Sequence, residues 1–271
     1  MKKMSTVVAC LVSVAGIAFA GAKVQIDDQS SIDVGFRVQP LLIVTEKDVD
    51  GDGTLDTDSD FKVRRGRLRL KGTITDRVGA FIQTDLGSGV GGSGYDWRVI
   101  DAWISLKMCD HCTIYAGENM VPASRQNLTS SGALMAIDRP GINYKTLTWG
   151  ARSVYAFANN TMSDADSGLR GDVDVRDNGA TAFGASSLSD TLHLKYYAGV
   201  YDGIPETEQD DLRLAGRIQL NFFAAERRYF NLTTYLGGKN TVGVGVSSDL
   251  QDHVATRDAT RHVHSPFHTS D

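Results

Sequence analysis

The sequence has few long apolar runs, few cysteines and no excess of positive charge, and each of these features excludes a class of protein. Beyond the N-terminus there is no stretch of about 18 apolar residues, so a helical membrane bundle is excluded. Three cysteines are too few for a disulfide-built scaffold. The 28 basic residues are outnumbered by 33 acidic ones, whereas nucleic-acid-binding proteins are normally basic. What remains is a soluble β-rich protein or a transmembrane β-barrel, in which every second residue faces water.

The first 22 residues have the organisation of a cleaved secretory signal. Lys2 and Lys3 precede a stretch of small and apolar residues, and two overlapping small-x-small patterns follow it. We expect cleavage after Ala20 or Ala22, which removes both lysines and leaves 26 basic and 33 acidic residues, a mature charge of −7. A membrane anchor is the alternative, but the apolar stretch is short and ends in a cleavage pattern. The mature protein is therefore expected outside the cytoplasm.

Apolar and polar residues alternate with a period of two over most of the mature chain. The clearest windows are residues 32–42, 61–76, 78–85, 100–107, 192–201 and 212–222. Strict alternation over eight or more residues is typical of strands, and helical spacing fails in each window. We count nine or ten such runs. Most are about ten residues long, which is enough for a tilted strand to cross a membrane.

The connections between these runs alternate in length. Short turns are expected at residues 75–77, 109–112 and 188–190, and long polar segments at 46–60, 121–144 and 203–211. Short turns on one side and long loops on the other are typical of an outer-membrane barrel. A soluble sandwich also alternates, but runs of charge on the polar face, after a signal peptide, fit a water-filled lumen better.

Several segments carry a family resemblance. Residues 61–72 read FKVRRGRLRLKG and residues 100–107 read IDAWISLK, while residues 114–140 contain YAGENMVP, LTSS and DRP. With AGVYDG at 198–203 and RIQL at 217–220, they resemble the phosphate-selective porin O and P family over residues 32–250. The resemblance implies an all-β, antiparallel transmembrane β-barrel, typically of sixteen strands. Such barrels are commonly homotrimers in outer-membrane lipid, and they pass anions or other small solutes.

The chain departs from that family near its C-terminus. The alternation is lost after Val246, and residues 251–271 carry no apolar stripe and end on Thr-Ser-Asp rather than on a strand with a terminal aromatic residue. We therefore expect a truncated porin, with a partial barrel at residues 23–250 and an irregular, disordered tail. Unpaired strand edges in lipid cost several kcal/mol per unsatisfied group. Either a second chain closes such a sheet or the sheet does not insert stably.

The strongest candidate site is a ladder of cations on one strand. Arg65, Arg67, Arg69 and Lys71 are expected on one face, about 6.5–7 Å apart, with leucines on the opposite face. In a lumen this ladder would give anions an electrostatic path. Further inward cations are expected to join it: Lys195, Arg213 and Arg217. The alternative is an ordinary polar wall of mixed charge, because inward aspartates are expected as well.

The long segment 121–144 is the second candidate. The family resemblance implies that it folds into the barrel and narrows it, which places Arg125 and Arg139 near the constriction.

The acidic run that begins at Asp48 has the spacing of a calcium loop. Asp48, Asp50, Asp52 and Asp56 occupy positions 1, 3, 5 and 9 of an EF-hand pattern, with Ser59 in place of the final glutamate. The sequence thus predicts either Ca²⁺ binding in an external loop or a solvated acidic loop. No cofactor is required.

Cys109 and Cys112 flank the turn Asp110-His111. In an oxidising compartment a local disulfide is favoured over two free thiols.

The sequence thus favours an outer-membrane porin for passive diffusion of small solutes, with a preference for anions such as phosphate. The alternative is a non-conducting barrel fragment, or a sheath for a partner protein in electron transfer or export. No serine–histidine–aspartate context and no carboxylate dyad is found, so an enzyme is not expected.

Overall fold

The protein is an antiparallel all-β structure, as a computed structural model describes it for residues 20–47, 53–87, 96–135, 175–203 and 212–250. Within these residues ten strands are hydrogen-bonded in chain order: β1 Ala20–Gln25, β2 Ser31–Lys47, β3 Asp56–Thr73, β4 Val78–Gly87, β5 Asp96–Cys109, β6 Cys112–Met120, β7 Arg176–Ser187, β8 Leu192–Tyr201, β9 Arg213–Phe223 and β10 Thr241–Leu250. The expected all-β fold and the count of nine or ten strands are confirmed. No helix in the described part of the chain is long and apolar enough to cross a membrane.

The two faces of the strands are inverted relative to those of a soluble sheet. On β9 the side chains of Arg213, Arg217 and Gln219 are buried, whereas Leu214 and Ile218 are 54% and 61% exposed. Alternate residues of a strand point to opposite faces. The polar face of this sheet is therefore buried, and its apolar face is exposed. This is the pattern of a membrane-spanning strand with its polar side toward a lumen.

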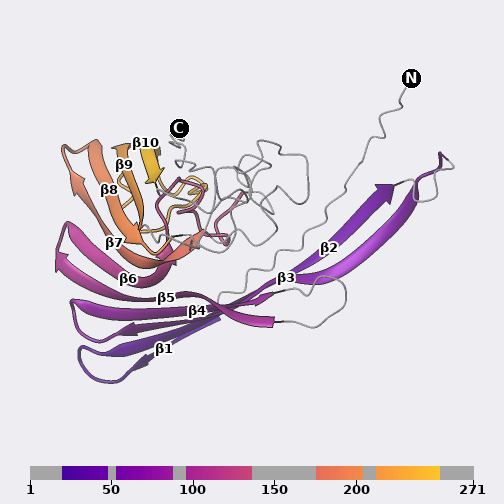
Figure 1. Ribbon diagram of the computed structural model, residues 1–271, viewed down its shortest axis with the longest axis horizontal. Coiled ribbons are helices and arrows are strands. Elements are labelled where there is room, and N and C mark those ends of the chain that lie inside the picture. Colours follow the sequence, from indigo (N-terminus) through magenta and orange to yellow (C-terminus); the bar gives the residue numbers. More distant parts are fainter. Residues whose placement is uncertain (1–19, 48–52, 88–95, 136–174, 204–211, 251–271) are drawn as a thin grey trace, which may run out of the picture. The chain divides into compact units, whose positions relative to one another are not determined.

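The chain divides into two compact units, each of which is described by itself. The first comprises Met1–Gly72 and Ile82–Ile100, and the second comprises Thr73–Phe81 and Asp101–Asp271. In the first unit β1 pairs with β2 in register from Ala20↔Phe36 to Gln25↔Ser31. In the second, β6 to β10 pair successively into a curved sheet, and residues 121–135 and 224–240 lie on its concave side (Figure 1).

The short turns at one end of the strands of the second unit are stabilised by hydroxyl side chains. Thr75 Oγ1 accepts hydrogen bonds from the N–H groups of Arg77 and Val78, at 3.2 and 3.0 Å. Ser189 Oγ accepts from the N–H groups of Thr191 and Leu192. Such side-chain turns are the usual reason for Ser and Thr at these positions. The structure therefore has short turns at the three places where the sequence predicts them.

The expected connection at residues 46–60 is too long. β2 continues to Lys47 and β3 begins at Asp56, so both strands extend into the polar segment. The physical reason is that a strand shows a period of two in the sequence only where one of its faces is apolar and the other is polar. The start of β3, from Asp56 to Asp60, is exposed and polar on both sides, so it gives no periodic signal although its backbone is extended.

Residues 224–240 form a long connection that the period-two pattern did not reveal. The N–H of Phe223 donates to the carbonyl of Thr191, and Arg227 donates to Ser187 Oγ. The segment therefore leaves the sheet at the same end of the strands as the short turn 188–191. Long connections are thus not confined to the opposite end. From there it runs along the concave face, where the N–H of Asn231 donates to the carbonyl of Leu128 at 2.8 Å.

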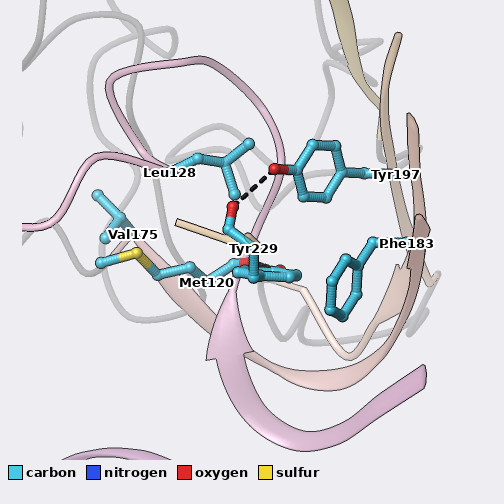
Figure 2. Packing of buried hydrophobic residues seen from close by; sticks show 6 residues of the cluster. All are labelled: Met120, Leu128, Val175, Phe183, Tyr197 and Tyr229. Carbon is cyan, nitrogen blue, oxygen red and sulfur yellow. Dashed lines mark hydrogen bonds between the residues drawn. The ribbon is translucent and has the colours of Figure 1, made fainter. Parts of the chain in front are cut away.

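We call residues 121–135 and 224–240 the two inner segments. A small hydrophobic cluster holds them against the sheet of the second unit (Figure 2). Its buried members are Met120, Leu128, Val175, Phe183, Tyr197 and Tyr229. The Tyr229 ring lies 4.7 Å from Phe183 and 5.3 Å from Tyr197, both in edge-on geometry, and Tyr197 Oη donates to the Tyr229 carbonyl at 2.6 Å. Aromatic pairs in this arrangement contribute about 0.5–1.5 kcal/mol beyond their burial. The cluster thus fixes the inner segments on the polar face.

Candidate pore-lining site

The cation ladder of the first unit lies on the covered face of β3. Arg65 is 5% exposed and its Nη1 donates to Gln39 Oε1 at 3.0 Å. Arg67 Nη2 pairs with Asp85 Oδ2, also at 3.0 Å, and both of these side chains are largely buried. The guanidinium of Arg69 lies over the backbone of Gly35.

The rest of β3 continues this alternation only in part. Leu68 and Leu70, 38% and 39% exposed, occupy the other face, while Lys71 at the end of the ladder is exposed. Three of the four predicted cations are therefore largely buried, and Lys71, two residues before the end of β3, is exposed.

A fourth arginine belongs to this group. Arg37 on β2 is 8% exposed and lies within electrostatic reach of Arg65, Arg67, Arg69 and Asp85. The alternation over residues 32–42 puts Arg37 on the polar face of its strand. The alternation of one strand does not show which side chains of another strand lie beside it, so Arg37 is not part of the predicted ladder. We call Arg37, Arg65, Arg67 and Arg69 the arginine cluster. The charges that act on Arg37 include those of the three other arginines and that of the Asp85 carboxylate.

The second unit distributes its cations differently. Arg213 is fully buried and donates to Asp249 at 2.8 and 2.6 Å and to Asp177 at 3.2 Å. Arg176 donates to both carboxylate oxygens of Asp101, at 2.8 and 3.1 Å. Paired charges of this kind compensate the desolvation cost of burial. Arg213 was expected in the anion path, but it lies between two carboxylates.

Lys195 and Arg217, the other two cations expected in the path, are also covered. Lys195 is 1% exposed and its Nζ donates to Asn231 Oδ1 at 2.8 Å. Arg217 Nη1 donates to Ser247 Oγ at 2.7 Å, and its Nη2 lies 3.3 Å from Gln219 Oε1. Lys195 thus lies beneath the inner segment 224–240, whereas Arg217 bonds to side chains of β9 and β10.

Arg125 joins the two inner segments. Its guanidinium donates two hydrogen bonds of 2.8 Å to the two oxygens of Glu226, and a third of 3.1 Å to the Leu232 carbonyl. Glu226 also accepts from Gln219, Asn221 and Tyr235, at 2.7, 3.0 and 2.5 Å. The Glu226 carboxylate is therefore the acceptor at the centre of a network between β9 and both inner segments.

This network sets the ionisation of Glu226. Burial alone would raise the pKa of the carboxyl, but hydrogen bonds from Arg125, Tyr235 and Asn221 and the charge of Arg125 lower it to about 2 from its ordinary 4.5. The hydrogen bond to Glu226 likewise raises the pKa of Arg125. Both groups are therefore charged at neutral pH.

Neither Glu226 nor the carboxylate partners of Arg213 and Arg176 were among the expected site residues. The alternation over residues 100–107 puts Asp101 on the polar face, whereas no sequence pattern assigns a role to Asp177, Asp249 or Glu226. For Glu226 the available signal was the loss of alternation after Phe223, which marks a connection but does not show that it folds inward.

Some expected site residues lie outside the described part of the chain. They are Arg139 of the constriction segment and the loop aspartates Asp48, Asp50 and Asp52. Asp56 begins β3 and is exposed. Among the residues that the structure describes, no group of three or more His, Cys, Asp or Glu side chains could hold a metal ion. Calcium binding stays a prediction.

Cys109 and Cys112 are opposed across the β5–β6 hairpin, as the turn prediction implies. They are cross-strand partners in the register, and both carry free thiols in this structure. The local disulfide stays a prediction.

Comparison with known proteins agrees with this geometry. The family model described as phosphate-selective porin O and P matches residues 44–203, which include the arginine cluster except Arg37, the β5–β6 hairpin and β7–β8. The chain belongs to this family. No curated protein matches it. The porin family is one of outer-membrane channels rather than an enzyme class, and the covered polar and uncovered apolar faces of this porin's strands suit that setting.

Proposed function

We propose that this porin is a passive diffusion channel with a preference for small anions such as phosphate. The observation that carries the proposal is the arginine cluster, in which four guanidinium groups share the covered face of β2 and β3 with the Asp85 carboxylate. Rings or rows of like charge facing a water-filled lumen favour ions of the opposite sign. Guanidinium also matches the geometry of phosphate oxygens better than ammonium does.

The negative net charge of the chain does not oppose this proposal. Permeation depends on the charge at the narrow part of a pore more than on the total, and many acidic residues lie in connections, as the run from Asp48 does. In the second unit Arg213 and Arg176 are offset by Asp177, Asp249 and Asp101. The anion preference is therefore assigned to β2 and β3 rather than to β7–β9.

The test is the reversal potential of the full chain in planar lipid bilayers under a potassium chloride gradient. The unmodified protein is expected to show a potential of the sign given by chloride permeation, and Arg67→Glu/Arg69→Glu should shift it toward cations. The matched control is Arg77→Glu/Arg98→Glu, which changes the net charge equally at two exposed arginines and should leave the potential within a few millivolts of the unmodified value.

Three results contradict the proposal. They are cation preference in the unmodified protein, an unchanged potential in Arg67→Glu/Arg69→Glu, and an equal shift in the control. Absence of any conductance from inserted protein would favour the alternative of a non-conducting barrel or a sheath for a partner protein.

A further inference from the structure

The tip of the β5–β6 hairpin carries two cysteines in disulfide-forming register. β5 ends at Cys109 and β6 begins at Cys112, with Asp110 and His111 as the two turn residues. The two cysteines are directly opposed. Opposed residues of an antiparallel pair have Cα atoms about 4.5–5.5 Å apart, and a disulfide needs roughly 4.4–6.8 Å. The Cα separation typical of such a pair therefore lies within the range of a disulfide, and the register is irregular only between Lys107 and Cys109.

Both cysteines are accessible to solvent, although to different degrees. Cys109 is exposed and Cys112 is partly exposed. The turn between them is held by the neighbouring hairpin, because Tyr196 Oη donates to the His111 carbonyl at 2.9 Å and His111 Nδ1 lies 3.2 Å from the Ala185 carbonyl. The tip is therefore held in place by hydrogen bonds to β7 and β8.

A bond between these cysteines would add little to stability. The loop that it closes contains only the residues from Cys109 to Cys112. The entropic stabilisation by a disulfide becomes smaller as the loop becomes shorter. Exposed disulfides that contribute little to folding are the ones that exchange readily with other thiols. These properties indicate an exchangeable bond rather than a structural one.

The position of the tip indicates which compartment it meets. It lies at the same end of the strands as the turns 74–77 and 188–191. The N–H of Lys107 donates to the carbonyl of Arg77 in the first turn, and His111 contacts Ala185 on the strand that precedes the second. In outer-membrane barrels the short turns face the periplasm, where thiols are oxidised. We propose that Cys109 and Cys112 form a reversible redox site that exchanges a disulfide with periplasmic dithiol–disulfide proteins.

The exchange is balanced in two steps. The thiolate of one cysteine attacks the disulfide of the partner, forming a mixed disulfide and releasing one partner thiolate. The thiolate of the second cysteine then attacks the porin sulfur of the mixed disulfide, which forms the Cys109–Cys112 bond and releases the second partner thiolate. Two electrons pass from the porin to the partner, and the two protons lost by the cysteines are taken up by the partner's thiolates.

The first experiment counts thiols in the full chain isolated from outer membranes. Free thiols are blocked with one maleimide, the protein is reduced, and newly exposed thiols are labelled with a second maleimide. We expect the peptide containing Cys109 and Cys112 to carry only the second label, and its mass before reduction to be lower by two hydrogens. The variants Cys109→Ser and Cys112→Ser should each show one thiol that reacts before reduction. First-label reaction at both cysteines of the unmodified chain, or a cross-link between two chains, overturns the proposal.

The second experiment tests exchange in the folded protein. Millimolar reduced glutathione should open the bond without denaturant, and oxidised glutathione should close it again, with both thiol counts read by the same two labels. Opening only after unfolding in urea would show a structural disulfide and would overturn the redox assignment. Neither readout uses conductance, so the result is independent of the proposed anion channel.

Discussion

Arg125 and Glu226 are joined by two parallel hydrogen bonds of 2.8 Å although they are 101 positions apart in the chain. Arg125 belongs to the segment that follows β6, and Glu226 to the segment that follows β9. These segments leave the sheet at opposite ends of the strands and meet on its concave face. The ion pair therefore links two connections that the strand order alone would keep apart.

Removal of this pair should loosen both inner segments. Glu226 is 2% exposed at its side chain, so Arg125→Ala leaves a covered carboxylate without its cation. Breaking a buried pair costs about 3–5 kcal/mol, and because Arg125 is itself 34% exposed, we expect a loss near 3 kcal/mol in urea unfolding followed by tryptophan fluorescence.

The matched control for this loss is Arg227→Ala. Arg227 is exposed and makes one hydrogen bond, to Ser187 Oγ at 3.0 Å, so its removal should change stability by less than about 0.5 kcal/mol. Equal effects of the two substitutions would contradict a special role for the Arg125–Glu226 pair.

The same pair makes the inner segments sensitive to acid. Because the pKa of Glu226 is about 2 in the folded protein and 4.5 ordinarily, its stabilising contribution is complete above pH 4.5 and is lost as the pH falls toward 2. Cleavage by pepsin within residues 224–240 should therefore increase between pH 4 and pH 2. In Glu226→Gln the susceptibility should already be high at pH 4 and rise less on acidification. A parallel rise in both proteins would contradict this assignment.

Arg213 should tolerate replacement only together with its partners. Arg213→Met leaves the buried carboxylates of Asp177 and Asp249 facing each other without a cation, and a loss of about 3–5 kcal/mol is expected. The triple variant Arg213→Met/Asp177→Asn/Asp249→Asn removes all three charges and should recover most of that loss, as measured by urea unfolding. A triple variant no more stable than the single one would show that the charges are not the cause.

Gly117 of β6 should be sensitive to the smallest substitution. Its φ is +124°, and a Cβ atom at this position would lie 2.2 Å from the Ala102 carbonyl oxygen. Gly117→Ala should destabilise the protein by at least about 1–3 kcal/mol, the usual cost of a strained backbone conformation. Gly216→Ala on β9 is the control, because its Cβ would meet the Tyr197 carbonyl oxygen at an ordinary 3.4 Å. If both variants are equally stable, the backbone at Gly117 can relax.

Most strands, and the faces of their side chains, could be predicted from the amino-acid sequence alone. Alternation has a period of two because successive residues of a strand point to opposite sides, so the pattern on β3 could place Arg67 and Leu68 on different faces without any structure. Turn chemistry at Thr75 and Ser189 likewise requires only neighbouring residues. These are local properties, and for them the sequence is sufficient.

Which charges act on one another depends on contacts in the folded chain. Arg213 and Lys195 had the same signal as Arg67, an inward cation on an alternating strand, yet Arg213 lies between Asp177 and Asp249, Lys195 lies beneath Asn231, and Arg67 belongs to a cluster of like charges. The difference arises from strand register and from two irregular segments that fold inward. Neither is encoded in a local period, because both depend on contacts between residues many positions apart. The electrostatics of a lumen follow from those contacts and not from the alternation that creates its wall.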